Sequence, residues 1–210
     1  MKIAGVILAG GLARRMGGKD KAFIEVGGET LLARVIARLT PQVDGIVLNA
    51  NGDPARFAGF GLPVVPDTVE GFAGPLAGVL AGMRWAAARG YTHVASTAGD
   101  TPFFPTDLIA RLAAAFAETG WPIAMAVTQD PERGLSEHPT FALWPVALAD
   151  DLEEALAHVH MRKIIVWASC HGCARAVFDG MPNDGAGYPF FNINTPEDIV
   201  VAERILKERA

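Results

Sequence analysis

The sequence has only two cysteines, Cys170 and Cys173, and both belong to one Cys-His-Gly-Cys segment. A zinc site would need two further ligands, and c-type haem attachment would need histidine directly after the second cysteine, where Ala174 stands. Three histidines lie between residues 158 and 171, so a metal site stays an alternative, although ligand number and spacing match no standard site. We expect two reduced thiols in a cytosolic protein.

Long apolar runs and an excess of basic residues are also absent. No apolar stretch reaches the roughly 18–20 residues that a membrane span requires, and the apolar run at the start is too short for a signal peptide. Asp and Glu number 23 against 18 Lys and Arg, for a net charge of −5, whereas nucleic-acid binders usually carry a basic face. We therefore expect a cytoplasmic protein that contacts neither membrane nor nucleic acid.

One stretch is a basic, glycine-rich exception to this acidic composition. It runs from Leu8 to Lys21, LAGGLARRMGGKDK, and follows an apolar segment that predicts a buried first strand. Glycines let successive backbone N–H groups converge on an anion, and Arg14, Arg15, Lys19 and Lys21 can neutralise its charge. Because open α/β sheets bind ligands at the carboxyl ends of their strands, the stretch indicates a cradle for phosphates.

Two familiar phosphate-binding loops do not match this stretch. The P-loop pattern needs glycine five residues before the glycine of Gly-Lys-Ser/Thr, but Ala13 stands there and Asp20 follows Lys19. Gly10-Gly11-Leu12 breaks the spacing of the dinucleotide fingerprint G-x-G-x-x-G. A flexible surface loop stays the plainer alternative.

Short apolar runs alternate with helical patterns along the 210 residues, which predicts a single Rossmann-like three-layer α/β domain with a mostly parallel central sheet. The expected strands cover residues 2–8, 44–49, 62–65, 92–98, 123–128, 139–144 and 174–178. The expected helices cover residues 31–39, 75–89, 105–118, 145–158, 161–167 and 196–210. Residues 129–137 are expected to form a polar loop, and residues 190–194 an extended segment.

Two aspartates lie just beyond the ends of predicted parallel strands, on the same edge of the sheet as the glycine-rich stretch. Asp100, in Gly-Asp-Thr-Pro, is the better candidate for Mg²⁺, which prefers one or two carboxylates together with phosphate oxygens and water. Asp67 can accept hydrogen bonds from a nucleobase, and guanine offers N1–H and N2–H₂ side by side. Asn49 is a second candidate for a base or ribose contact. Each of these residues is also typical of a turn.

Two asparagines near the end of the chain are candidates for the lining of a polar site. Asn192 and Asn194 are two residues apart in an extended segment, so their side chains point to one face. An edge strand with a solvated face would show the same pattern. His138 has no evident Ser or Cys partner for triad chemistry and is expected to be structural.

The motif LAGG-x-ARRMGG-x-DK (Leu8 to Lys21) resembles the signature of the molybdenum cofactor guanylyltransferases, within the wider nucleotidyltransferase superfamily. The resemblance extends over nearly the whole chain, in the same order, through Asn49, Asp67, GPLAG (74–78), GDTP (99–102), HPT (138–140) and FNINTPED (191–198). The chain departs from the family at Ala73, where proline often precedes GPLAG.

This resemblance implies transfer of GMP from GTP to molybdenum-loaded molybdopterin, with release of pyrophosphate. Residues 1–105 would form the GTP-binding half, and residues 106–210 would contribute the pterin side. Lys21, Arg15 and Asp100 would be catalytic, with Mg²⁺ on Asp100. The implied contacts to GTP are Leu8, Ala9, Gly10, Gly11, Lys21, Asn49, Asp67 and Asp100, and Asn192 and Asn194 would lie on the pterin side or between the two sites.

Two other functions stay open on the sequence alone. One is a cytidylyltransferase for the same pterin, or a sugar-1-phosphate nucleotidyltransferase. The other is a non-catalytic adaptor that hands the cofactor to molybdoenzymes. The expected partners besides GTP and the pterin are molybdopterin-loading proteins and molybdoenzyme chaperones, and we expect a monomer.

Overall fold

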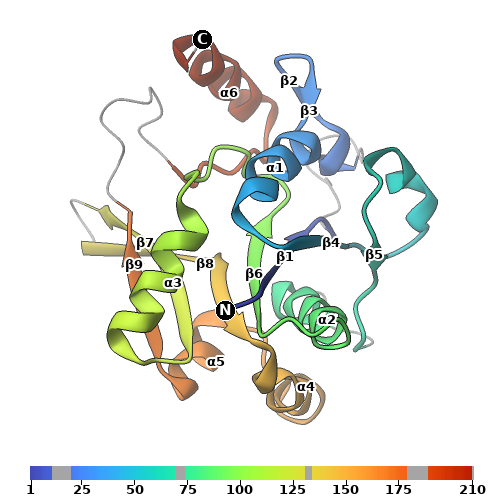
Figure 1. Ribbon diagram of the computed structural model, residues 1–210. Coiled ribbons are helices and arrows are strands. Elements are labelled where there is room, and N and C mark those ends of the chain that lie inside the picture. The colour runs from blue at the N-terminus through green and yellow to red at the C-terminus, as the bar shows by residue number, and fades with distance from the viewer. Residues whose placement is uncertain (11–19, 70–73, 131–133, 179–188, 210) are drawn as a thin grey trace.

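A computed structural model of the protein describes residues 1–10, 20–69, 74–130, 134–178 and 189–209, and its elements form an α/β architecture (Figure 1). The central sheet has seven strands. Their spatial order is β5 (Val64–Val65), β4 (Gly45–Asn49), β1 (Ile3–Leu8), β6 (His93–Ala98), β8 (Gly134–Pro145), β7 (Ile123–Asp130) and β9 (Cys173–Val177).

The first four strands of this order run parallel, and β9 runs parallel to β7, while β8 is antiparallel to both of its neighbours. The prediction of a mostly parallel sheet is therefore confirmed. In the register of the inner strand β1, Leu8 pairs with Asn49 of β4 and with Ala98 of β6. The three strands therefore end at one level, which gathers the residues that follow them at one edge of the sheet.

Helices cover both faces of the sheet. On β1, Ile7 packs toward the face covered by α1 (Leu31–Leu39) and α3 (Leu108–Thr119). Ala4 and Val6 pack toward the opposite face, which the remaining sheet-packing helices cover. Those helices are α2 (Pro75–Ala87), α4 (Ala149–His158) and α5 (Ile164–His171). This period-two alternation makes β1 apolar on both sides, as a buried parallel strand requires.

A smaller apolar cluster lies beyond the edge of the main layers. It joins the short ribbon of β2 (Glu25–Val26) and β3 (Glu29–Thr30) to α6 (Pro196–Arg209), through Val26, Ile193, Ala202 and Ile205. Figure 1 shows α6 beside this ribbon. The cluster ties the end of the chain to the segment that follows the glycine-rich stretch.

In the residues that the structure describes, four short 3₁₀ helices connect the regular elements: η2 (Lys21–Phe23), η3 (Thr40–Gln42), η4 (Pro54–Phe60) and η5 (Val146–Leu148). The first of them, η2, is capped by the Asp20 carboxylate, which accepts from the N–H of Ala22 at 3.1 Å. The helix expected from residue 105 begins at Leu108, and the one expected from residue 145 begins at Ala149 after η5.

The prediction of a polar loop at residues 129–137 is wrong. β7 continues to Asp130 and β8 begins at Gly134, and the two strands pair to their ends. Cross-strand hydrogen bonds hold this polar sequence in a hairpin although it lacks apolar alternation. The helix expected at 161–167 is also displaced and runs from Ile164 to His171, after His160 adopts a left-handed φ of 51°.

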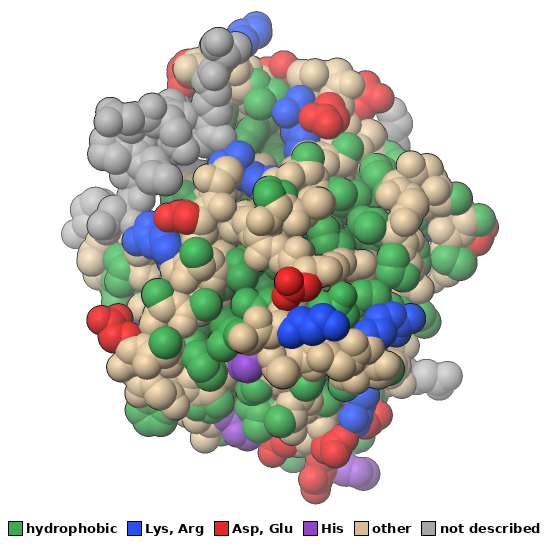
Figure 2. Space-filling view, in the orientation of Figure 1, with side chains coloured by type: hydrophobic (Ala, Val, Ile, Leu, Met, Phe, Trp, Pro, Cys, Tyr) green, Lys and Arg blue, Asp and Glu red, His purple; other side chains and the backbone are tan. Residues whose placement is uncertain are grey.

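The face shown in Figure 2 carries Lys and Arg side chains interspersed with Asp and Glu among apolar and uncharged groups. No helix in the described part of the chain is both long enough and apolar enough to span a bilayer.

Candidate functional site

A cavity of about 770 Å³ lies at the carboxyl ends of the parallel strands, which is the size range of small-molecule sites. Many of its lining residues are the candidates singled out from the sequence: Leu8, Ala9, Gly10, Asn49, Asp67, Asp100 and Asn192. Lys21 joins this set because it donates to Asp100, and Asn194 joins it because it accepts from Lys21. Gly11 and Arg15, together with Arg14 and Lys19, lie outside the described residues.

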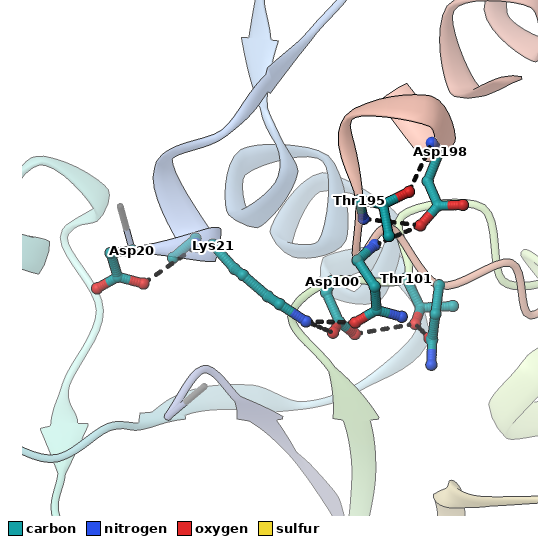
Figure 3. A network of polar contacts seen from close by, with 9 residues as sticks. Asp20, Lys21, Asp100, Thr101, Thr195 and Asp198 are labelled. Carbon is teal, nitrogen blue, oxygen red and sulfur yellow. Dashed lines mark hydrogen bonds and ion pairs between the residues drawn. The ribbon is translucent and has the colours of Figure 1, made fainter. Parts of the chain in front are cut away.

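Lys21 connects the start of the chain to its end at this cavity. Its Nζ lies 3.2 Å from Oδ2 of Asp100 and also donates to Oδ1 of Asn194 (Figure 3). The Lys21 and Asp100 side chains are 20% and 23% exposed, so solvent screens this ion pair only partly. Because an ammonium has three N–H donors, one donor of Lys21 is left for an anionic ligand.

Asp100 is held in place by its own backbone and by a neighbouring hydroxyl. Thr101 Oγ1, which has one proton to donate, lies 3.2 Å from Oδ1 of Asp100 and also within hydrogen-bond distance of Oδ1 of Asn192. The carbonyl of Asp100 accepts from the N–H of Ile193 at 2.9 Å. A Cβ on the preceding Gly99 would lie 3.2 Å from the carbonyl oxygen of Leu8, so glycine lets this turn approach β1 closely.

The segment that carries Asn192 and Asn194 forms no strand of the described sheet. The two amides reach the same site, as their spacing predicts, and the alternative of an edge strand is wrong. Instead, the N–H groups of Asn194 and Thr195 donate to Oδ2 of Asp198, each at 2.8 Å. Burial raises the pKa of Asp198, but these N–H bonds, with nearby Lys21, outweigh it and leave that pKa below its usual value.

Asp67 has two amide donors on its carboxylate. Nδ2 of Asn49 donates to Oδ1 at 2.9 Å, and Nδ2 of Asn51 donates to Oδ2 at 2.8 Å. A carboxylate has about four acceptor positions, so roughly two remain for a ligand. With every position an acceptor, this carboxylate can take a pair of N–H donors from a base.

Asn49 is 5% exposed, and its amide is committed to the protein. Besides the bond to Asp67, its Nδ2 donates to the carbonyl of Val65 at 3.3 Å. Its Oδ1 faces α2, where a Cβ on Gly78 would lie 2.2 Å away. Asn49 is therefore placed to hold Asp67, and the glycine that ends GPLAG provides the space for its amide.

This arrangement predicts that Gly78→Ala raises the KM for the substrate bound in this cavity by about tenfold, because the new methyl group displaces Asn49 and with it Asp67. Gly82→Ala, in the same helix α2, is the matched control, since the atoms nearest to its Cβ would be those of the Val6 side chain in β1, at 2.7 Å. Thermal unfolding should show both variants destabilised, while steady-state kinetics should show a changed KM in Gly78→Ala alone. Equal KM values for the two variants would contradict the role given to Gly78.

Among the polar and charged residues that line the cavity, sequence reasoning missed Asp20, Asn51 and Arg56. Nη1 of Arg56 lies 2.6 Å from Oδ2 of Asp20, and its Nη2 donates to the carbonyl of Asn51 at 2.8 Å. Asn51 offered a signal, because it lies two residues after Asn49 at the end of a predicted strand. Arg56 offered none, because its partner lies 36 residues earlier in the chain.

His138 is a structural residue, as expected. Its ring stacks on Phe190 with centroids 4.2 Å apart, and its Nε2 lies 2.9 Å from Oγ1 of Thr128. Burial lowers its pKa to about 4, so the imidazole is neutral near pH 7. Two residues later, Thr140 lines the cavity.

The Cys-His-Gly-Cys segment lies at the end of α5 and the start of β9. Burial raises the pKa of Cys173 to about 11, and Nε2 of His171 lies 2.8 Å from Oδ1 of Asp151. In the part of the chain that the structure describes, no three His, Cys, Asp or Glu residues are grouped so that they could hold a metal ion.

At Asp100 the cavity offers Mg²⁺ one carboxylate, so the ion would need further ligands from phosphate oxygens and water. Asp100 supplies one carboxylate, and Thr101 and Lys21 occupy only about half of its acceptor positions. A magnesium ion bound through one carboxylate needs phosphate oxygens and water for its remaining ligands. The donor set is therefore consistent with a metal that binds together with a triphosphate.

Comparison with known proteins shows extensive similarity. The model of the family "MobA-like NTP transferase domain" matches residues 5–171. A molybdenum cofactor guanylyltransferase of Nitrobacter hamburgensis is 51% identical over 203 residues, covering 96% of this chain and 93% of the relative. One of Cereibacter sphaeroides is 47% identical over the full length of both chains.

The fold is also similar to that of solved structures. The crystal structure of molybdopterin-guanine dinucleotide biosynthesis protein A from Archaeoglobus fulgidus superposes with a TM-score of 0.72 at 24% identity. The match covers 98% of this chain and 99% of that one.

Proposed function

Because the chain belongs to the MobA-like NTP transferase family and, within it, to the molybdenum cofactor guanylyltransferases, we propose that it transfers GMP from GTP to molybdenum-loaded molybdopterin. Pyrophosphate is the second product. The observation that carries this proposal is the cavity itself, which joins a cation–carboxylate pair, Lys21 and Asp100, to an acceptor carboxylate, Asp67. The pair is suited to phosphates and the lone carboxylate to guanine.

The two ends of the cavity suggest how GTP lies in it. Asp67, held by two amides, accepts N1–H and N2–H₂ of guanine with its remaining acceptor positions. Leu8, Ala9 and Gly10 line the cavity along the ribose and the α-phosphate. Lys21 directs its remaining N–H donor at the α-phosphate. Arg15, which lies outside the described residues, is proposed to bind the departing pyrophosphate.

The pterin phosphate attacks the α-phosphorus in line with the departing pyrophosphate. This nucleophile is already ionised near pH 7, so no general base is required, and none is assigned among the residues of the cavity. Catalysis then depends on positioning and on the relief of negative charge as pyrophosphate leaves. Mg²⁺ on Asp100, when bound, would neutralise part of the charge on the phosphates.

Asn192 and Thr140 line the cavity together with Asp100, and we assign this side to the pterin substrate. Asn192 comes from the end of the chain and Thr140 from β8, whereas Asn49 is the last residue of β4 and Asp67 follows β5. The two substrates would therefore approach from opposite sides of β1 and meet over Lys21 and Asp100.

A panel of nucleotides tests the base assignment and separates this function from its rivals. The purified protein is incubated with molybdenum-loaded molybdopterin, Mg²⁺ and GTP, CTP, UTP or ATP, and released pyrophosphate is measured. We expect turnover with GTP at least about tenfold faster than with any other nucleotide, because only guanine offers two adjacent N–H donors to Asp67. A preference for CTP would reject the assignment of Asp67, and nucleotide binding without pyrophosphate release would indicate a cofactor-handover adaptor.

A further inference from the structure

Asn51 and Asp67 form a reciprocal pair at the base end of the cavity. Nδ2 of Asn51 donates to Oδ2 of Asp67 at 2.8 Å, and Oδ1 of Asn51 accepts from the backbone N–H of Asp67 at 2.9 Å. The two residues are thus joined through both the side chain and the main chain of Asp67. This double contact fixes the direction in which the carboxylate points.

Arg56 links this pair to a further residue of the cavity, Asp20. Arg56 donates to the carbonyl of Asn51 at 2.8 Å and forms an ion pair with Asp20 at 2.6 Å, and all three residues line the cavity. Asn51 is exposed, unlike Asn49, which is buried beneath Asp67. The carboxylate is therefore held from below by Asn49 and from the solvent side by Asn51.

We propose that Asn51 is a positioning residue that sets the selectivity of this site for guanine. The proposal rests on the proposed use of GTP. By donating to one oxygen of Asp67 and accepting from its N–H, Asn51 holds the carboxylate in a single orientation, with its free acceptor positions toward the base. Cytosine and adenine carry a lone-pair acceptor at the edge that faces Asp67. Because the carboxylate is fixed and is itself an acceptor, it repels this lone pair, and both bases are rejected.

Inosine triphosphate is the discriminating probe, because it lacks only the N2 amino group of GTP. In the native protein we expect kcat/KM for GTP to exceed that for ITP by about tenfold or more, since a charged acceptor loses one donor. In Asn51→Ala the carboxylate turns more freely and is solvated by water. We expect kcat/KM for GTP to fall by about 10- to 100-fold, chiefly through KM, and the ratio of GTP to ITP to shrink toward one.

Asn51→Asp is the matched variant that separates selectivity from loop shape. It keeps an oxygen that can accept from the N–H of Asp67, but replaces the donor to Oδ2 with a second carboxylate. If Asn51 positions the carboxylate, this variant loses GTP preference at least as strongly as Asn51→Ala. If Asn51 only shapes the turn, Asn51→Asp keeps the GTP to ITP ratio of the native protein, and the proposal is rejected.

The same measurements distinguish a failure of the base assignment from a failure of the inference about Asn51. Thermal unfolding without nucleotide should be similar for the native protein and both variants, because Asn51 is exposed. A native protein that uses GTP and ITP equally would overturn the base assignment and this inference with it. A native protein that prefers GTP, with variants that keep the full preference, would overturn the inference about Asn51 and leave the proposed function standing.

Discussion

Replacing Asp100 by alanine is expected to lower kcat by about 10³-fold or more, with the protein still folded. Asp100 is the single carboxylate that contacts Lys21 among the described residues, and Thr101 holds it at the edge of the cavity. Removing it deletes the proposed Mg²⁺ ligand and frees Lys21 from its ionic partner. A bound metal ion supplies several kcal/mol of charge stabilisation in phosphoryl transfer, which corresponds to this loss. Pyrophosphate release at saturating GTP and pterin measures it.

Asp100→Asn is the control for shape, because it keeps the volume and an acceptor for Thr101 while removing the charge. We expect it to be nearly as inactive as Asp100→Ala at every Mg²⁺ concentration. Titration with Mg²⁺ gives a second readout, in which half-saturation should be seen only in the native protein. Wild-type turnover of either variant at saturating Mg²⁺ would remove Asp100 from the metal site.

Replacing Lys21 by alanine is expected to lower kcat by about 10²- to 10³-fold, with a smaller change in KM for GTP. The reason is geometric: Asp100 and Asn194 fix the position of the ammonium and take two of its three N–H donors, which leaves one donor for the ligand. Negative charge grows on the departing pyrophosphate during the reaction, so a donor fixed at the α-phosphate stabilises the transition state more than the ground state. Steady-state kinetics with separate GTP and pterin titrations measures both constants.

Lys21→Arg keeps the charge but replaces a compact ammonium with a larger, planar group. We expect it to recover GTP binding and only part of the turnover, because the guanidinium does not fit between Asp100 and Asn194 with the same reach. A Lys21→Ala protein whose kcat is unchanged and whose KM alone rises would show that Lys21 only binds GTP.

The fold could be predicted from the sequence where apolar periodicity is strong. Apolar runs on β1 and β4, the Thr30 cap of α1, and the Gly-Pro start of α2 each have a local physical cause that a single segment contains. The hairpin of β7 and β8 lacked such a cause, because cross-strand bonds hold its polar residues in place. The helices near η5 and α5 begin later than predicted, because tertiary packing rather than local sequence decides where they start.

The site could be predicted in part. Asp67, Asp100 and the Asn192–Asn194 pair were found because the ends of parallel strands, and alternate residues of an extended segment, have a known direction. The hydrogen-bond partners of these side chains could not be predicted. The bond between Lys21 and Asn194 spans 173 positions, and the one between Arg56 and Asp20 spans 36. Only the folded chain shows that the Asn49 amide holds Asp67 rather than facing solvent.

The central claim is that one cavity binds both substrates and passes GMP directly from GTP to the pterin. The most direct test follows the label in a reconstituted reaction with native protein, Mg²⁺ and molybdenum-loaded molybdopterin. With GTP labelled at the α-phosphorus, the account predicts that label enters the pterin product and never the protein. With GTP labelled at the γ-phosphorus, it predicts that label leaves as pyrophosphate, only when pterin is present. Labelled protein, or pyrophosphate formed without pterin, would contradict it.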